Sequence, residues 1–306
     1  MKLGFAMPHL MRLKATSQPW EAMVTGAEQT KLIQWAEKLG FEMVAVPEHH
    51  AIPQKHVELS GPHYFSAFTA MAYFAGATQT MRVNSCISIL PVQHPIITAK
   101  ALSTMDWLAS GRVTVTFAVG WLEDEFAALG VDFHKRGRMA EEYIQAIIAL
   151  WTQASPQFDG EFVSFKDLAF EPKCVQKPHL PIWFGGDAEA VLKRTARYAS
   201  GWWPFLTKPE QIAEKIEFIK SQPDYNGQLT DIFYGFATSR VGEGHVPQSD
   251  PKARPGMTKQ AIIDRLSWLK EQGVTWSSVP IPALVNIEAY YDYSQWLAEE
   301  IMPAVK

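Results

Sequence analysis

The stretch MVAVPEHH at residues 43–50 joins a short apolar run to three titratable side chains. A valine-rich run of this length is typical of a strand buried on both faces, as the strands of a parallel sheet are. Ligands of parallel α/β folds bind at the carboxyl ends of the strands. Glu48, His49 and His50 leave the predicted strand at that end. The stretch therefore predicts a ligand site there, and an enzyme is the leading hypothesis.

Short apolar runs alternate with segments of helical period along the rest of the chain. The apolar runs predict eight strands, at residues 2–7, 43–47, 82–90, 112–119, 181–185, 201–205, 232–239 and 274–280. The periodic segments predict eight helices, at residues 27–39, 65–76, 95–109, 138–151, 187–199, 208–220, 259–271 and 287–302. These units predict an α/β fold of the (β/α)8 TIM-barrel type, because closure covers both faces of a parallel sheet and removes its edges.

A doubly wound open sheet is the alternative fold. The regular unit length favours the barrel, as does the absence of GxGxxG after the first strand, where a dinucleotide-binding sheet carries it. Two segments exceed ordinary loops, residues 48–64 and 152–180, and the second contains a predicted hairpin around residues 158–162. We expect these insertions at the carboxyl-end loops, where long loops shape a substrate site. Without a low-complexity linker, we predict a single domain over residues 1–306.

Composition limits the classes of partner. The formal net charge is -4 at pH 7, so the chain lacks the positive excess that neutralises nucleic-acid phosphates. Cys86 and Cys174 are the only cysteines, too few for a disulfide framework and without metal or redox spacing. The first residues lack a secretory leader pattern, and no apolar run is long enough for a membrane helix. We expect a cytoplasmic protein that acts on a small molecule, with no nucleic-acid or membrane partner.

His49 and His50 are the candidate catalytic residues, because histidine titrates near neutral pH and exchanges protons with a ligand. The alternative is a structural pair that ties the loop to the barrel rim. His56 and His63 raise a metal site as a further alternative. Against a metal, no two of these histidines have the i, i+4 spacing of a helical site, and Glu48 precedes the pair instead of lying between its members.

Glycines mark a second candidate site. The fifth predicted strand ends in Gly185-Gly186-Asp187-Ala188 and opens directly into a helix. Bare glycines before a helix amino terminus expose backbone N–H groups that attract phosphate. The turn therefore predicts a phosphorylated cofactor on the same rim as His49. The alternative is an ordinary tight turn in which Asp187 caps the helix.

Large aromatic side chains follow two of the predicted strands. Trp202, Trp203 and Phe205 lie at the end of the sixth strand, and Trp121 follows the fourth. Aromatic rings at a barrel mouth wall an apolar pocket or stack on a planar ring, whereas core packing is the ordinary alternative. We predict that these four residues form a substrate pocket for an apolar or planar compound.

Several segments in a fixed order carry a resemblance to a known family. They are VPEHH at 46–50, HPIITAK at 94–100, LASGR at 108–112, VGWLEDEF at 119–126, GEF at 160–162, PHLPIWFGG at 178–186 and GW at 201–202. This ordered set resembles the bacterial luciferase-like family of flavin-dependent oxidoreductases, especially its coenzyme F420-type branch. The resemblance implies a TIM-like barrel that uses a reduced flavin, FMN or coenzyme F420, for monooxygenation or hydride transfer on a small organic substrate.

The resemblance also implies residue roles. His49 and His50 match the strand-end histidines of the family, and a non-prolyl cis peptide bond behind the ring matches Cys86–Ile87. The implied cofactor-binding residues are Ser85, Cys86, Ile87, Val119, Gly120, Gly185, Gly186, Asp187 and Ala188. From the residues alone, a lone cysteine such as Cys86 is more often an inert small side chain than a nucleophile. No metal is implied.

One position departs from part of the family. Trp121 stands where sugar-phosphate dehydrogenases of the deazaflavin branch carry a glutamate, which speaks against that activity. Glu123 and Glu125 follow closely, and ion pairs with Arg136 or Arg138 are the alternative to a substitute role. The resemblance further implies a homodimer and, for FMN, a separate flavin reductase. The alternative functions are a metal-dependent barrel hydrolase and a non-catalytic flavin-binding relative.

Overall fold

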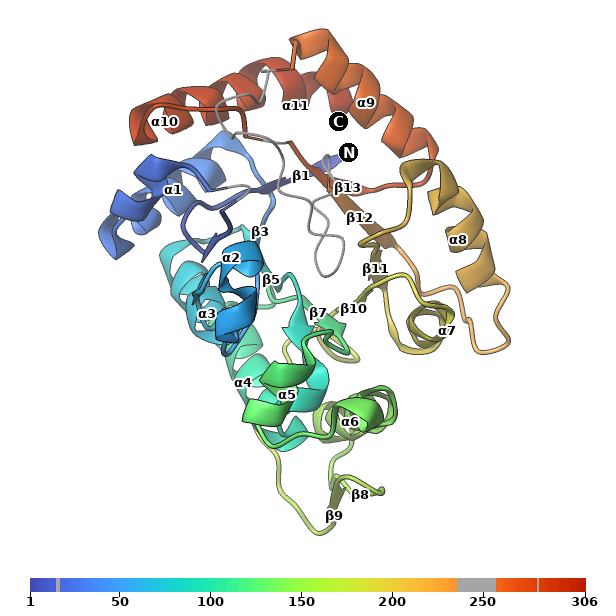
Figure 1. Cartoon of the computed structure of the whole chain (residues 1–306). Helices are drawn as coiled ribbons and strands as arrows, with labels where there is room; N and C mark the ends of the chain where they lie inside the picture. The colour runs from blue at the N-terminus through green and yellow to red at the C-terminus, as the bar shows by residue number, and fades with distance from the viewer. Residues whose placement is uncertain (15–16, 236–256, 280) are drawn as a thin grey trace.

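The computed structural model describes residues 1–14, 17–235, 257–279 and 281–306, and one parallel sheet of nine strands forms its centre (Figure 1). The strands, in sheet order, are β5 (Arg82–Ser85), β3 (Met43–Val46), β1 (Lys2–Phe5), β13 (Trp276–Ser278), β12 (Asp231–Gly235), β11 (Gly201–Trp203), β10 (Ile182–Gly185), β7 (Val115–Ala118) and β6 (Ser88–Ile89). The two outer members of this order, β5 and β6, are consecutive in the chain and belong to one barrel position.

The barrel closes through that position. Val83 of β5 forms a parallel bridge with Val113, just before β7, while β6 pairs with β7 further along. The nine described strands therefore occupy eight positions around the barrel, and the predicted (β/α)8 fold is confirmed. The predicted strand 82–90 is divided into β5 and β6, and the Cys86–Ile87 peptide bond between them is cis.

Helices surround the barrel on its outer side (Figure 1). They are α1 (Gly26–Leu39), α2 (Val57–Ser60), α3 (Ala67–Ala77), α4 (Pro95–Leu108), α5 (Glu123–Ala128), α6 (Arg136–Thr152), α7 (Glu189–Tyr198), α8 (Ile212–Lys220), α9 (Lys259–Glu271), α10 (Ile287–Trp296) and α11 (Met302–Val305). Local sequence sets several ends. Thr25 and Glu28 form a capping box at the start of α1, and Gly40 ends that helix with a φ of 90°.

Alternation along the strands separates the helix-facing side from the barrel interior. Apolar residues on the outer face, such as Val44, Phe117 and Ile232, are buried beneath the helices. The intervening residues face inward, where Met43, Trp183, Phe233 and Trp276 form a buried cluster. Large side chains thus fill the lower barrel, which makes it a packed core that cannot act as a pore.

Some predicted boundaries differ from the structure. The predicted helix 187–199 begins at Glu189, and the predicted helix 287–302 is interrupted by a π-helical segment, Leu297–Ile301. The first turn of the predicted helix 208–220 is a 3-10 turn, Pro209–Gln211. Residues 236–239 and 280 of two predicted strands lie outside the described residues.

The two insertions have structure of their own. The predicted hairpin is present as β8 (Phe158–Asp159) paired antiparallel with β9 (Ser164–Phe165). The insertion after β3 contains α2 and β4 (His63–Tyr64), and β4 pairs antiparallel with β2 (Met11–Arg12) from the loop after β1. This small sheet ties the first two carboxyl-end loops together. Within the described residues, no helix combines the length and the apolar character needed to cross a membrane.

Candidate active site at the carboxyl end of the barrel

Small side chains line the barrel interior at the carboxyl ends of the strands. Above the buried aromatic cluster, the next inward-facing residues are Ala6, Ala45, Cys86, Ala118, Gly185, Trp203, Gly235 and Ser278. All except Gly185 are at least partly exposed, whereas the inward-facing residues one layer below are buried. We call these eight residues the mouth layer. Only Trp203 among them is large, so the mouth layer is formed mainly by small side chains above a solid floor.

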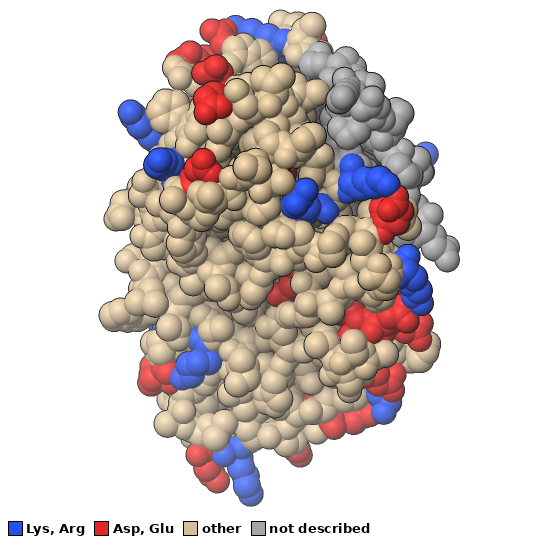
Figure 2. All heavy atoms as spheres, turned by 60° about the vertical axis from the view of Figure 1, so that its left-hand side comes forward, with Lys and Arg blue, Asp and Glu red and all other residues tan. Residues whose placement is uncertain are grey.

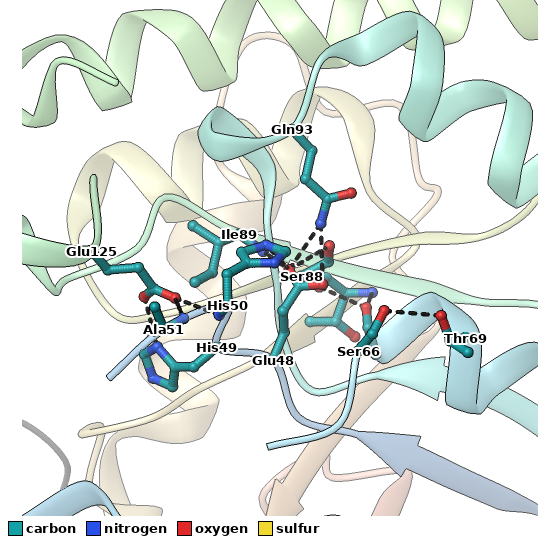
Figure 3. A network of polar contacts seen from close by, with 12 residues as sticks. Glu48, His49, His50, Ala51, Ser66, Thr69, Ser88, Ile89, Gln93 and Glu125 are labelled. Carbon is teal, nitrogen blue, oxygen red and sulfur yellow. Dashed lines mark hydrogen bonds and ion pairs between the residues drawn. The ribbon is translucent and has the colours of Figure 1, made fainter. Parts of the chain in front are cut away.

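His49 follows the carboxyl end of β3, the strand that contributes Ala45 to this layer, and is held by a buried carboxylate. Its Nδ1 is 2.7 Å from Oε2 of Glu125, and the two side chains are 10% and 0% exposed. The other oxygen of Glu125 accepts hydrogen bonds from the backbone N–H groups of His50 and Ala51 (Figure 3). Burial alone would raise the pKa of Glu125, but these hydrogen bonds and the nearby imidazole outweigh it and lower the pKa. Glu125 is therefore a carboxylate at neutral pH.

Aromatic rings surround the His49 imidazole. Tyr64 of β4 meets it edge-on with ring centroids 4.9 Å apart, and Trp121 does so at 6.0 Å. Trp121 is 37% exposed and also contacts His56, 5.8 Å away. Burial and the charge of Glu125 raise the pKa of Tyr64, so its phenol stays neutral. His49 thus sits between an apolar wall and a fixed negative charge.

His50 points away from His49, toward Glu48 (Figure 3). Its Nε2 is 3.8 Å from Oε2 of Glu48. The Glu48 carboxylate accepts hydrogen bonds from Ser88 Oγ, the Ile89 backbone N–H and the Gln93 side chain at 2.8–3.1 Å. Desolvation raises the pKa of this buried carboxyl group. Glu48 therefore ties the end of β3 to β6, and the structure separates the two histidines that are adjacent in sequence.

The predicted metal alternative depended on Glu48 and the histidines acting together. In the described part of the chain, no three histidine, cysteine, aspartate or glutamate side chains gather as metal ligands would. Glu48 contacts Ser88, Ile89 and Gln93, and Glu125 is taken up by His49 and two amides. Nothing in this geometry favours a metal hydrolase.

The predicted cis peptide bond at Cys86–Ile87 is present. It places Ile87 over Gly185, where a Cβ atom would come within 2.6 Å of the Ile87 Cγ2. Glycine at 185 is therefore required for the Ile87 side chain to lie in the mouth of the barrel. Desolvation raises the pKa of the Cys86 thiol to about 12, so the group is a neutral thiol and a poor nucleophile.

Gly120 is fixed by the backbone and by its surroundings. Its φ is 80°, and a Cβ there would lie 2.7 Å from Phe126 and 2.8 Å from Ile89. Arg136 donates to the Gly120 carbonyl through Nε, at 3.2 Å, and so braces the turn after β7. Ser85, by contrast, faces away from the mouth and donates to the Thr116 carbonyl oxygen. The side chain of Ser85 therefore supports the sheet and cannot line the mouth.

The alternative ion pairs for the two glutamates after β7 are wrong. Glu125 pairs with His49, as described above, and Glu123 lies 3.7 Å from His134. Arg138 pairs with Glu161 of the hairpin, at 2.9 Å. The helix α5 explains the difference, because its period places Glu125 on the buried side and Glu123 on the exposed side.

The Asp187 side chain does not cap the helix, although the alternative of an ordinary tight turn predicted that it would. Ala188, and not Asp187, is the N-cap residue of α7. The Asp187 carboxylate instead accepts hydrogen bonds from the backbone N–H groups of residues 205–207 and from the Thr207 hydroxyl. Gly186 has a φ of 121°, and its N–H donates to the Trp203 carbonyl. This leaves the backbone of the following turn, at the start of α7, as the part available to a phosphate.

The structure shows where the residues of the predicted aromatic pocket lie. Trp202 faces outward between Gly201 and Trp203, is 0% exposed, and packs in the cluster formed with residues of α7, α8 and α9. Its assignment to the pocket is therefore wrong, since alternation along β11 turns it toward the helices. Trp203 faces inward and stacks on Phe233 with ring centroids 3.6 Å apart. Phe205 is 39% exposed in the loop that Asp187 holds.

Three features of the site were not predicted from the sequence: the pairing of Glu125 with His49, the position of Tyr64 and the mouth layer. Glu125 has a recognisable signal, because it shares the apolar helical face of Leu122 and Phe126, where a carboxylate needs a partner. Tyr64 had none, because its place depends on the pairing of β4 with β2. The mouth layer has a sequence signal, because small residues such as Ala6, Ala45 and Ala118 lie near the ends of strands. A pattern of this kind is readable only once the inward face is known.

Sequence comparison places these features in a known family. The family described as luciferase-like monooxygenase matches residues 1–235. An uncharacterized protein of Mycobacterium tuberculosis is 36% identical over 191 residues, covering 58% of this chain and 66% of that protein. The FMNH2-dependent dimethylsulfone monooxygenase of Pseudomonas putida is 29% identical over 209 residues, covering 66% of this chain and 55% of the enzyme. These alignments span less than two thirds of the relatives' own length.

Solved structures agree on the fold. The monooxygenase RslO1 from Streptomyces bottropensis superposes with a TM-score of 0.79 at 20% identity, over 100% of both chains. An F420-dependent secondary alcohol dehydrogenase, in complex with an F420-acetone adduct, superposes with a TM-score of 0.75 at 16% identity, over 100% of this chain and 99% of that one. At these identities the likeness concerns the barrel.

Proposed function

Because the chain belongs to the luciferase-like monooxygenase family, we propose that it is a flavin-dependent oxidoreductase acting on a small organic substrate. Its cofactor in this proposal is a reduced flavin, either FMN or coenzyme F420. The observation that carries the proposal is the mouth layer of small residues at the carboxyl ends of the strands, together with the His49 imidazole that Glu125 holds just after β3. When bound, such a cofactor supplies hydride transfer or, in the case of FMN, activation of O2.

The residues present fit a planar ring. Cys86, Ala118 and Gly185 keep the inward surface low, and a Cβ at Gly185 would fill the space that Ile87 occupies. Ile87 offers an apolar side chain for one face of the ring. In our proposal Cys86, Ile87, Val119 and Gly120 contact the ring, while the backbone N–H groups of Asp187 and Ala188 bind the phosphate. The N–H of Gly186 is already donated to the Trp203 carbonyl. Asp187 contributes through its backbone alone, because its carboxylate is already used.

His49 is the proposed proton donor or acceptor. Its partly exposed ring lies beside Tyr64 and Trp121, which exclude water from one side. A proton exchanged at a positioned imidazole is worth about 10²- to 10⁴-fold in rate. Cys86 takes no part in proton transfer, because its raised pKa keeps the thiol neutral. His50 remains in the proposal as a neighbour that contributes its backbone N–H to the Glu125 network.

An anaerobic titration tests the proposal. The purified protein is titrated in turn with FMN, reduced FMN and F420, and binding is followed by absorbance and by quenching of cofactor fluorescence. Saturable binding of one cofactor, at one molecule per chain, is the expected result. Turnover with that reduced cofactor is then measured with and without O2, which separates oxygenation from hydride transfer. The proposal fails if none of the three cofactors binds.

Two partners accompany the proposal. If FMN is the cofactor, a separate flavin reductase supplies it in reduced form. We also propose a homodimer formed through α3 and α4, in the cytoplasm. The eleven residues of α3 include no charged side chain. On α4, Ile97, Trp107 and Leu108 are 67%, 60% and 70% exposed. Figure 2 shows a broad uncharged area on this side of the molecule, with charged side chains mainly at its margins.

A further inference from the structure

The contact between His49 and Glu125 determines which nitrogen of the His49 ring carries a proton. Oε2 of Glu125 lies 2.7 Å from Nδ1 of His49, within hydrogen-bond distance. Glu125 is a carboxylate, and a carboxylate can only accept hydrogen bonds. Nδ1 must therefore carry a proton. In the neutral imidazole the lone pair is then on Nε2, which becomes the only ring nitrogen able to accept a proton.

Glu125 is itself unable to turn away. Its side chain is 0% exposed, and its second oxygen receives the N–H groups of His50 and Ala51, the first at 2.5 Å and the second at 3.2 Å. These two amides directly follow His49 in the chain, so the carboxylate binds the side chain and the backbone of one short segment at once. The orientation of the imidazole is consequently coupled to the path of the chain after β3.

We propose that Glu125 is a positioning residue that holds His49 as the Nδ1–H tautomer and leaves Nε2 as the proton-exchanging atom. The carboxylate also stabilises the imidazolium that forms when Nε2 takes up a proton. The catalytic consequence rests on the proposed function, whereas the tautomer follows from the geometry of the ligand-free protein. Proton exchange at Nε2 balances without any further reactant, since the proton moves between that atom and the bound substrate or solvent.

The other ionisable groups near His49 are neutral or interact with other partners. Tyr64 packs edge-on against the ring and is kept neutral by burial and by the charge of Glu125. His56 lies beyond Trp121, and Asp124 is 2.6 Å from Lys55 and 3.8 Å from His56. Glu48 and His50 face each other on the other side of the segment, at 3.8 Å. Glu125 is therefore the charge in direct contact with the His49 ring.

Nitrogen NMR of the imidazole side chains tests the tautomer without any cofactor. The protein is labelled with ¹⁵N-histidine, and the His49 signals among its nine histidines are identified by their loss in His49→Gln. A proton on Nδ1 and a bare Nε2 are expected at pH 8, the reverse of the tautomer that free histidine prefers. Finding the proton on Nε2 in the wild type overturns the proposal, whatever the outcome of the cofactor titration.

Glu125→Gln then tests the consequence, with Glu123→Gln as the matched control. Glu123 lies on the same helix, its side chain is 64% exposed, and its partner is the exposed His134. Removing the negative charge next to His49 disfavours the imidazolium, so the limb of the pH–rate profile that reports its protonation moves to lower pH. Substrate KM stays the same while kcat falls about 10-fold. Glu125→Asp, which keeps the charge, restores part of kcat.

A purely structural role for Glu125 gives a different pattern. Loss of folded protein lowers the active fraction of Glu125→Gln without moving the pH profile, and circular dichroism measures that fraction. An unchanged pH profile in a folded Glu125→Gln protein therefore contradicts the proposal. The same holds if Glu123→Gln shifts the profile as much as Glu125→Gln does.

Discussion

His49 and His50 show how far adjacent residues of one type can differ in role. They leave β3 together, yet one imidazole contacts Glu125 and the other faces Glu48 (Figure 3). The difference comes from partners that are distant in sequence, since Glu125 lies 76 residues from His49. The carboxyl end of a barrel strand gathers such partners from several loops.

His49→Gln is expected to lower kcat by about 100-fold, because it removes the group proposed to exchange a proton with the substrate. Cofactor affinity should change little, since the proposed ring contacts belong to other residues. Steady-state kinetics with the reduced cofactor measures kcat, and a fluorescence titration measures affinity. The matched control is His134→Gln, whose side chain is 81% exposed on the surface. Wild-type kcat in His49→Gln contradicts the proposed role.

At the scale of elements, the join between β5, β6 and β10 shapes the mouth of the barrel. The cis bond at Cys86–Ile87 separates β5 from β6, and Ile87 then lies against Gly185 at the end of β10. Three strands thus meet in a small volume. A side chain added at one of them changes the space available to the others.

Gly185→Ala is expected to weaken cofactor binding about 10-fold or more, because the new Cβ would lie 2.6 Å from Ile87 Cγ2 and force that side chain to move. The double variant Gly185→Ala/Ile87→Ala removes the clashing methyl group and should recover part of the affinity. Fluorescence titration with the cofactor measures both. Gly137→Ala is the control, since open space surrounds that helical glycine. Equal affinities in the single variant and the wild type contradict the assigned contact.

A second junction links α1 to the segment that precedes β5. The Glu37 carboxylate accepts hydrogen bonds from the backbone N–H groups of Gln79, Thr80 and Met81. Partial burial acts to raise the pKa of Glu37, but these hydrogen bonds outweigh it and lower the pKa. The folded protein therefore favours the ionised form more than the unfolded chain does.

Glu37→Gln is expected to lower the free energy of unfolding by about 1 kcal/mol at pH 7. A lowered folded-state pKa stabilises the protein above the ordinary glutamate value of 4.5. That stabilisation is lost as the pH falls through the lower folded value. The difference between wild type and variant should thus shrink below about pH 4 in urea unfolding curves. Glu214→Gln, on the exposed side of α8, is the control. A difference independent of pH contradicts the assignment.

The sequence predicts the repeating strand–helix units better than it predicts contacts between segments that are far apart in the chain. The eight strand positions and most helices follow from local periodicity, and VPEHH at 46–50 lies at the carboxyl end of β3. The outward direction of Trp202 and the pairing of Glu125 do not follow, because each depends on register between segments far apart in the chain. Asp187 was misread for the same reason, since its partners at residues 205–207 belong to the next loop.

At the scale of the whole molecule, one side of the barrel exposes apolar side chains on two neighbouring helices. A single domain over residues 1–306 stays a prediction, but the apolar side formed by α3 and α4 is visible in the exposed residues (Figure 2). Tyr73 of α3 and Ile97, Trp107 and Leu108 of α4 are exposed, and a group of apolar side chains on neighbouring helices favours an interface more than single scattered ones do. This contrast is the basis of the proposed homodimer.

Ile97→Lys and Leu108→Lys are expected to convert the dimer into monomers, because each would place a charge in the middle of an apolar contact and, in a symmetric dimer, opposite its own copy. Both side chains are more than half exposed in one chain, so the substitutions should leave the fold intact. Sedimentation velocity measures the mass, and circular dichroism checks folding. Val285→Lys is the control, because Val285 is 86% exposed and lies outside both helices. A wild-type protein that sediments as a monomer at micromolar concentration contradicts the dimer, whereas a dimer that survives both substitutions places its interface on another face.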